Sequence, residues 1–553
     1  MIDTLRRTGP LAPPGHELPA HRDALLDDAH RGDIVGALGT VRMGDTAPRR
    51  SWKARLLTLL AIMGPGLIVM VGDNDAGGVA TYAQAGQNYG TSLLWVLLLL
   101  IPVLIVNQEM VVRLGLVTGV GHARLIIERF GTFWGAFSVG DLFLLNFLTI
   151  ITEFIGVNLA LGYFGVSPYL SVPIAALLLI GSAITGSFRR WERFMYVLIA
   201  ANFIAIPLAL MVHPNGGQIV HDSLVPGIKG GLNASALLLI IAMVGTTVAP
   251  WQLFFQQSNV IDKRLTPRWM AYERADTVIG SVIVILGASA LIIAAAFAFK
   301  GSALAGQFAD AGAVARGLSQ HTSRLAGAFF AIVLLNASLI GAAAVTLSTT
   351  YAFGDVFGMK HSLHRSWGDA RGFYAIYSGL VVVAAAVVLI PNAPLGLITT
   401  AVQALAGILL PSATVFLLLL CNDRDVLGPW VNKAWVNVLA TIIVGILVGL
   451  SLILAAATLF PSVDVTQMLV ALSGVLAIGL LATGALTVWR GRPAGARAIP
   501  LQDRLNWRMP PLAELHRPVW STTTKVGMIT LRGYLLIAVL LMVVKVVQLA
   551  TGR

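Results

Sequence analysis

Charged residues are scarce in this sequence of 553 residues. Asp, Glu, Lys and Arg make up 12% of the chain, whereas hydrophobic residues make up 57%. A soluble domain carries about 25% charged residues. The composition therefore excludes an ordinary soluble protein and is typical of a chain that crosses a membrane many times.

Cysteine is almost absent as well. The single cysteine, Cys421, excludes a disulfide within the chain and gives no support to a cysteine-based metal site. The first 28 residues lack an apolar stretch and are rich in Pro, Arg and Asp. We therefore do not expect them to form a cleaved signal peptide.

Long apolar segments are abundant, and a spanning helix needs about 20 mostly apolar residues. The sequence predicts 11 to 13 transmembrane helices, at 55–73 with 79–88, 91–112, 133–164, 169–187, 194–212, 232–260, 273–299, 325–357, 373–390, 396–420, 434–460 and 466–489, with a doubtful one at 533–550. Three regions follow. Residues 1–54 are predicted to be a disordered cytoplasmic tail, 55–489 a transmembrane transporter domain, and 490–553 a polar basic loop with a possible extra helix.

The net charge of +12 is a topology signal. With a cytoplasmic N-terminus, nearly all Lys and Arg residues fall in loops on the cytoplasmic side, as the positive-inside rule requires. The charge therefore needs no nucleic acid partner. We predict a multi-pass protein of the cell inner membrane.

The first informative segment lies inside the first predicted span, at Gly72-Asp-Asn-Asp-Ala-Gly-Gly78. Asp73 and Asp75 would be costly in lipid unless they face a cavity or a partner. The neighbouring glycines let the helix unwind, which frees backbone carbonyls as oxygen ligands. The segment therefore favours a cation site.

The second informative segment, 245–259, lies inside the sixth predicted span. Pro250 lacks a backbone donor and clashes with the preceding turn, so a break is expected between Thr246 and Ala249. The Thr246 hydroxyl either lines the pathway or bonds back to its own helix.

The two breaks are five helices apart. This spacing is expected of LeuT/APC-type inverted five-helix repeats, in which paired broken helices build a site at the membrane midplane. Ordinary helix kinks are the alternative, but they do not explain two aspartates at one break. The predicted fold is all-α, with broken first and sixth helices.

In combination, several segments resemble the NRAMP family of divalent metal transporters, and most closely its magnesium-transporting branch. They are Gly64-Pro-Gly66, Asp75-Ala-Gly-Gly78, Arg113-Leu-Gly-Leu-Val-Thr-Gly119, Glu153-Phe-Ile-Gly156, Arg274-Ala-Asp-Thr-Val-Ile-Gly280 and the stretch Gly245 to Gln252. The resemblance covers roughly residues 55–460.

The resemblance implies a metal site with altered ligands. The family holds its metal with an Asp, an Asn, a Met and backbone carbonyls. Here Asp75 keeps the Asp position, but Gly78 replaces the Asn and Ala249 replaces the Met. Losing a soft thioether removes a preference for transition metals, and the smaller side chains suit a partly hydrated Mg²⁺. The predicted metal site comprises Asp75, Asp73, Gly78, Thr246, Ala249 and Gln403.

Two of these assignments have alternatives. Gln403, in the tenth predicted span, resembles a family glutamine that approaches the metal, but a helix-packing hydrogen bond explains it equally. The family's proton pathway is depleted here, because Trp251 replaces a His and Ile150 replaces an Asp, leaving Glu153. Glu153 either carries protons or hydrogen-bonds a neighbour, and weak or absent proton coupling follows.

The expected function is transport of Mg²⁺ and Mn²⁺ by alternating access. The alternatives are an ordinary proton-coupled Mn²⁺/Fe²⁺ transporter, an amino-acid permease of the same fold and a non-transporting receptor. Two aspartates would repel a carboxylate substrate, which favours a cation. No enzyme activity and no resident cofactor are expected. The divalent ion and the lipid bilayer are the expected partners, and the oligomeric state stays open.

Overall fold

The computed structural model describes residues 27–45, 47–391, 394–459, 465–489 and 500–515, with isolated positions beyond them. The described part is almost entirely helical. Its first half contains η2 (Asp28–His30), β1 (Ile34–Val35), β2 (Thr40–Val41), α1 (Trp52–Ile62), α2 (Pro65–Gly72), α3 (Ala76–Tyr89), α4 (Leu94–Thr118), α5 (His122–Phe130), α6 (Thr132–Tyr163), α7 (Pro168–Ala183), α8 (Phe188–Asn202), α9 (Ala205–Met211) and α10 (Gly216–Leu224).

The second half continues the bundle. It contains α11 (Ala234–Thr247), α12 (Pro250–Asp262), η3 (Pro267–Trp269), α13 (Met270–Ala298), α14 (Ala311–His321), α15 (Arg324–Phe357), α16 (Arg371–Val388), α17 (Leu395–Cys421), α18 (Arg424–Leu427), η4 (Gly428–Trp430), α19 (Ala434–Leu459), α20 (Val465–Trp489), α21 (Leu501–Asn506) and η5 (Leu512–Glu514).

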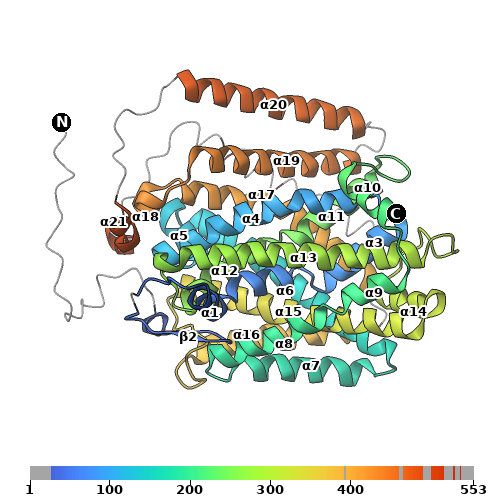
Figure 1. Cartoon of the computed structure of the whole chain (residues 1–553), viewed down its shortest axis with the longest axis horizontal. Helices are drawn as coiled ribbons and strands as arrows, with labels where there is room; N and C mark the ends of the chain where they lie inside the picture. Colours follow the sequence, from blue (N-terminus) through green and yellow to red (C-terminus); the bar gives the residue numbers. More distant parts are fainter. Residues whose placement is uncertain are drawn as a thin grey trace.

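The long helices lie side by side in one bundle, with α7 and α20 at opposite edges (Figure 1). Their ends follow local sequence rules. In α15, for example, the Ser323 side chain accepts a hydrogen bond from the backbone N–H of Ala326, and Gly358 ends the helix in the left-handed conformation. Serine N-caps and left-handed glycine C-caps are the usual helix ends.

Among the described residues, nine helices are long and apolar enough to cross a membrane, or ten if α1 and α2, bent by 55°, form one span. The sequence predicted 11 to 13. The difference lies in α7 and in the described apolar part of α20, residues 467–479, which are shorter. The protein is a multi-pass membrane protein, although the segment 533–550 lies outside the described residues except for two positions.

The predicted helix breaks are present. The first lies between α2 and α3, at Asp73 to Asp75, and the second between α11 and α12, at Val248 and Ala249. The halves of the two broken helices pack against each other, α2 on α12 and α3 on α11. This arrangement confirms the all-α fold with broken first and sixth helices.

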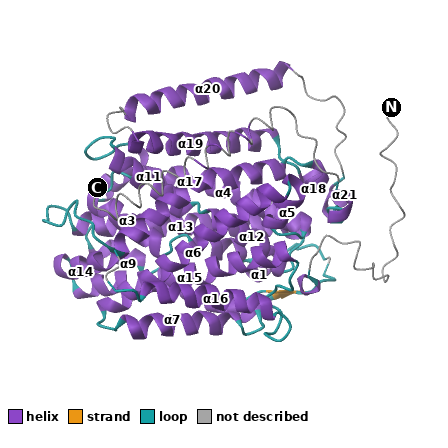
Figure 2. Ribbon diagram, turned by 180° about the vertical axis from the view of Figure 1, so that it is seen from behind, coloured by secondary structure: helices purple, strands orange, loops and turns teal. Residues whose placement is uncertain are grey.

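The predicted disordered tail over 1–54 needs correction from residue 27 onward, and its first 26 residues lie outside the described part of the chain. Residues 27–45 are ordered, with a short antiparallel pair of β1 and β2 in which Ile34 lies opposite Val41. Asp27 and His30 are buried. This segment packs beside α1 at one end of the bundle, the end that also carries α5 and α18, whereas α10 and α14 lie at the other end (Figures 1 and 2).

Candidate functional site

Two aspartates, Asp73 and Asp75, define the first helix break. Asp73 ends α2, and Asp75 is the N-cap of α3, where its side chain accepts a 2.7 Å hydrogen bond from the backbone N–H of Gly78. An aspartate at this position satisfies a free helix donor and favours a helix start. Asp73 and Asp75 are 0% and 2% exposed, so both carboxylates are placed in the protein interior.

The helix α2 has only eight residues, and its N-terminus is capped from another helix. The Asp276 carboxylate of α13 accepts backbone N–H bonds from Gly64 at 2.9 Å, Gly66 at 2.8 Å and Leu67 at 3.1 Å. Arg274, two residues before Asp276, forms an ion pair with Glu109.

The second break faces the first. The Thr247 hydroxyl of α11 shares a 2.7 Å hydrogen bond with the Tyr82 hydroxyl of α3. The Gln252 amide of α12 donates to the Asp73 carboxylate, and it accepts from Gln108 at 3.1 Å. Sequence reasoning missed Gln252 as a site residue. Its signal was present, because a glutamine two residues after Pro250 is a polar side chain in the middle of a span.

Two predicted ligand positions, Gly78 and Thr246, lie together. A Cβ atom at Gly78 would lie 2.6 Å from the Asp73 carbonyl oxygen and 3.0 Å from the Thr246 hydroxyl oxygen. The Thr246 hydroxyl is buried, and it has no hydrogen-bond partner among the residues that the structure describes. A small residue at 78 therefore leaves the Asp73 carbonyl and the Thr246 hydroxyl facing the same space.

Gln403 approaches the first break from α17. A Cβ atom at Gly77 would lie 1.6 Å from the Gln403 side-chain nitrogen, so the amide packs directly on the glycine backbone. The Gln403 side chain is buried, and its nitrogen makes no hydrogen bond to any of the described residues.

Glu153 of α6 reaches the same break. Its carboxylate accepts a 3.0 Å hydrogen bond from the backbone N–H of Ala76, the first residue of α3. A Cβ atom at Gly341 of α15 would lie 2.6 Å from a Glu153 carboxylate oxygen and 2.8 Å from the Asp75 Cβ. Gly341 therefore lets Glu153 and Asp75 sit side by side, and Glu153 helps to hold the start of α3.

The remaining predicted positions are buried at or near the breaks. Ala249 is the N-cap of α12. The Trp251 ring lies against α2, since a Cβ atom at Gly72 would be 3.1 Å from it. Ile150 is a buried apolar residue of α6, one turn before Glu153. The structure therefore places Asp73, Asp75, Gly78, Thr246, Gln403 and Glu153 around the first break, with Ala249 at the second.

The electrostatics of this region favour a positive charge. Asp73 lies at the C-terminal end of α2, whose free carbonyls carry partial negative charge, as do those at the C-terminal end of α11. Asp75 adds a second carboxylate at the start of α3. Lys263 follows the last residue of α12, a helix of 13 residues, and therefore lies about 20 Å from the break. The basic side chain at that end of α12 does not neutralise the aspartates.

In the described part of the chain, no group of three or more His, Cys, Asp or Glu side chains is arranged to hold a metal ion. A cation at the breaks would therefore use the two aspartates together with hydroxyl, amide and backbone oxygens. Oxygen ligands of this kind suit Mg²⁺ and Mn²⁺. The near-complete burial of Asp73 and Asp75 shows that the region is closed to solvent in this conformation.

Comparison with curated proteins gives relatives along most of the chain. A divalent metal cation transporter MntH from Bacillus subtilis is 28% identical over 416 residues, which cover 72% of this chain and 93% of the relative. An MntH from Burkholderia ambifaria is 26% identical over 452 residues, covering 79% and 96%.

Solved structures agree on the fold. A manganese transporter from Eremococcus coleocola, in complex with an aromatic bis-isothiourea compound, superimposes with a TM-score of 0.60 at 22% identity, covering 81% of this chain and 98% of that one. The chain therefore has the LeuT-like fold of that transporter. The Nramp profile, described as natural resistance-associated macrophage protein-like, matches residues 66–457. Because this match spans more than half of the chain, the protein belongs to the Nramp family.

Proposed function

We propose that the protein carries divalent metal cations, Mg²⁺ and Mn²⁺, across the cell inner membrane by alternating access. Nramp proteins are membrane transporters and not enzymes, and the MntH relatives are named divalent metal cation transporters. The observation that carries the proposal is the placement of Asp73 and Asp75, both buried, where two broken helices meet. Net negative charge in that position selects a cation.

The preference for Mg²⁺ rests on what surrounds the aspartates. Gly78 and Ala249 stand where the family pattern has an Asn and a Met, so neither supplies a side-chain ligand. Without a sulfur ligand the site offers oxygen alone, which suits hard cations. Mg²⁺ keeps several of its waters when it binds proteins, and Gly78 and Ala249 carry no long side chain that would compete with those waters for the ion. These substitutions support the proposal that the protein belongs to the magnesium-transporting branch of the family.

Orientation follows from the basic residues. The end of the bundle that carries the N-terminal segment also carries α5, α18 and the basic start of α8, including Arg189 and Arg193. The positive-inside rule places this end in the cytoplasm. The half-helices α2 and α12 then form the cytoplasmic side of the site, and α3 and α11 the outer side.

Flux into proteoliposomes tests the proposal. The purified protein should pass Mg²⁺ and Mn²⁺ down their gradients, and each ion should compete with the other. Vesicles without protein are the control. Amino-acid flux in the absence of any divalent flux would support a permease of the same fold instead.

We further propose that transport is weakly coupled to protons or not coupled. Trp251 and Ile150 cannot titrate, and the Glu153 carboxylate is engaged with the Ala76 backbone. Metal entry should therefore leave the vesicle interior at constant pH. Glu153→Gln keeps a carbonyl oxygen for Ala76 and should retain metal flux within about threefold, which is less than 1 kcal/mol. A metal-driven proton influx that Glu153→Gln abolishes would contradict this.

A further inference from the structure

The ordered N-terminal segment makes contacts that a transport site at the two helix breaks does not require. We call residues 27–45 the N-terminal latch. On one side it packs closely on α1, because a Cβ atom at Gly36 would lie 2.1 Å from the Ala61 carbonyl oxygen. The Ala37 backbone N–H donates to the Glu192 carboxylate of α8, and Arg193 donates back to the Ala37 carbonyl at 3.1 Å.

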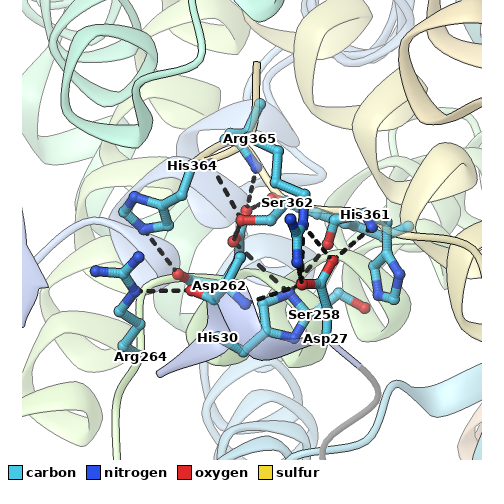
Figure 3. A network of polar contacts seen from close by, with 12 residues as sticks. Asp27, His30, Ser258, Asp262, Arg264, His361, Ser362, His364 and Arg365 are labelled. Atoms are coloured by element: carbon cyan, nitrogen blue, oxygen red, sulfur yellow. Dashed lines mark hydrogen bonds and ion pairs between the residues drawn. The ribbon is translucent and has the colours of Figure 1, made fainter. Parts of the chain in front are cut away.

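The latch also binds the loop between α15 and α16, residues 358–370. The Asp27 carboxylate accepts from the Arg365 guanidinium, with one N–O distance of 2.9 Å, and from the His361 backbone N–H at 2.8 Å (Figure 3). Although burial acts to raise it, these hydrogen bonds lower the pKa of Asp27 to about 2. Asp27 is therefore charged at physiological pH, and the ion pair with Arg365 persists.

A third set of contacts joins the latch to the end of α12. Arg264 donates to the Ala29 carbonyl at 2.8 Å, and the His30 ring lies 3.7 Å from the Asp262 carboxylate. Asp262 in turn accepts from the Ser362 hydroxyl and from the Leu363 backbone N–H at 2.9 Å (Figure 3). The latch, the end of α12 and the 358–370 loop thus form one buried polar network.

These contacts join the two halves of the fold. The helices α1 and α8 belong to the first five-helix repeat, whereas α12 and the 358–370 loop belong to the second. Lys263 reinforces the junction, because it donates to the Glu192 carboxylate of α8 and to the Met63 carbonyl, between α1 and α2, at 2.7 Å. The latch therefore lies across the end of the site formed by α2 and α12.

Alternating access requires one repeat or bundle to move against the other around the site. The latch is continuous with α1, so it moves with the first repeat. When α2 separates from α12, the contacts that must break are those of Asp27, His30 and Ala29 with the second repeat. A buried charge pair that loses its partner is costly, which makes these contacts a barrier to opening.

Resting on the proposed transport function, we propose that the N-terminal latch is an autoinhibitory device. It holds the cytoplasmic side of the site closed, and it must leave α12 and the 358–370 loop before a cation can pass. Nothing in the transport site itself requires this segment, because the latch supplies no side chain at either break.

The test uses one variant in two states. Cys421→Ala removes the native thiol, and Asp27→Cys with Arg365→Cys replaces the ion pair by two thiols. Unlinked, this full-length protein lacks the pair, and we expect faster amide hydrogen exchange in α2 and Mn²⁺ flux at least equal to that of the parent. Joined by a short thiol-reactive bifunctional reagent, it should lose at least about tenfold in flux, and α2 exchange should slow. Each single-cysteine variant, treated with the reagent, is the control.

A charge swap provides the second arm. Asp27→Arg and Arg365→Asp should each speed α2 exchange. The double variant should exchange more slowly than either single variant, because the ion pair returns, but faster than the parent, because the hydrogen bond from the His361 backbone N–H does not return. If the linked protein transports as fast as the unlinked one, or if the swap restores nothing, the latch does not gate the site. If the parent protein shows no Mn²⁺ flux, the proposed function is overturned. Amide hydrogen exchange in α2 then still tests whether the latch holds this helix.

Discussion

At the scale of single residues, the two aspartates at the first break have different surroundings. One oxygen of Asp75 accepts from the Gly78 backbone, which fixes the side chain at the start of α3. Asp73 accepts from Gln252, and among the described residues its other oxygen has no hydrogen-bond partner. That oxygen is therefore available to a cation, which agrees with the ligand role predicted for Asp73 from the sequence.

The identity of residue 249 tests how selectivity arises. Ala249→Met places a thioether at the second break without filling the space beside Gly78, where a side chain would lie 2.6 Å from the Asp73 carbonyl. We expect Cd²⁺ to inhibit Mg²⁺ flux about tenfold more tightly, equivalent to ~1.4 kcal/mol. Ala249→Leu has similar bulk and no sulfur, so it is the matched control. Equal Cd²⁺ inhibition of both variants would show that the sulfur does not reach the ion.

Several residue roles could be read from sequence and others could not. The aspartates and Pro250 were visible because polar and helix-breaking residues are rare inside apolar spans. The backbone N–H groups that donate to the Asp276 cap lie 209 to 212 positions earlier in the chain, and no local rule identifies such partners.

At the scale of elements, α2 depends on a cap from outside its own sequence. Asp276→Asn retains one carbonyl oxygen for three backbone donors, so one or two buried N–H groups lose their acceptor. Each costs about 1–3 kcal/mol, and we expect a lower thermal midpoint and faster exchange in α2.

Asp310→Asn is the control for this cap. Asp310 is the N-cap of α14 and accepts one N–H, from Ala313 at 2.7 Å. Asparagine caps helices as well as aspartate does, so this variant should be as stable as the parent. Equal stability of Asp276→Asn would mean that α2 does not need the cap.

The N-terminal latch is the element that the sequence analysis did not predict. Residues 1–54 carry no long apolar run, and β1 and β2 have two residues each, too short to give an alternating pattern. What orders the segment is its contacts with Glu192, Arg264 and Arg365, all more than 150 residues away. Composition described the segment correctly as polar, but it could not predict these partners.

The latch should loosen at alkaline pH through His361. Its ring nitrogen lies 3.1 Å from the Asp355 carboxylate. Although burial acts to lower it, Asp355 raises the pKa of His361 from 6.5 to about 9. The charged and titratable groups around it are Asp355 and Tyr351 of α15, Asp262 of α12, and Asp27 and His30 of the latch.

A group whose pKa is raised by folding stabilises fully below its unfolded value and stops doing so as pH rises through the folded value. The contribution of His361 should therefore be complete below pH 6.5 and be lost towards pH 9. Amide protection of residues 27–45, corrected for the intrinsic effect of pH, should fall by up to about tenfold per pH unit in this window. His361→Gln should flatten the dependence of this protection on pH. An unchanged pH dependence in this variant would exclude His361 as the titrating group.

At the scale of the whole molecule, sequence and structure agree on the main architecture. The apolar spans, the two breaks and their facing arrangement follow from hydropathy and from helix-breaking residues. Sequence and structure differ in the number of spans because α7 has 16 residues and the described apolar part of α20 is also short. A helix of this length crosses a bilayer only if its neighbours accommodate it, which its own sequence does not encode.

For the whole molecule, we propose that the two halves of the fold enclose a cation at Asp75. The measurement that tests this most directly is Mg²⁺ and Mn²⁺ flux by Asp75→Asn in proteoliposomes. Asparagine preserves the N-cap of α3, so this variant removes the charge and keeps the helix start. Asn74→Ala is the matched control, because Asn74 lies in the same break but donates its amide to the Val284 carbonyl at 3.0 Å.

We predict that Asp75→Asn lowers flux of both ions at least about tenfold, since Mg²⁺ and Mn²⁺ require carboxylate ligands, while Asn74→Ala stays close to the parent. Unchanged divalent flux in a folded Asp75→Asn protein would contradict the account and place the transport site elsewhere.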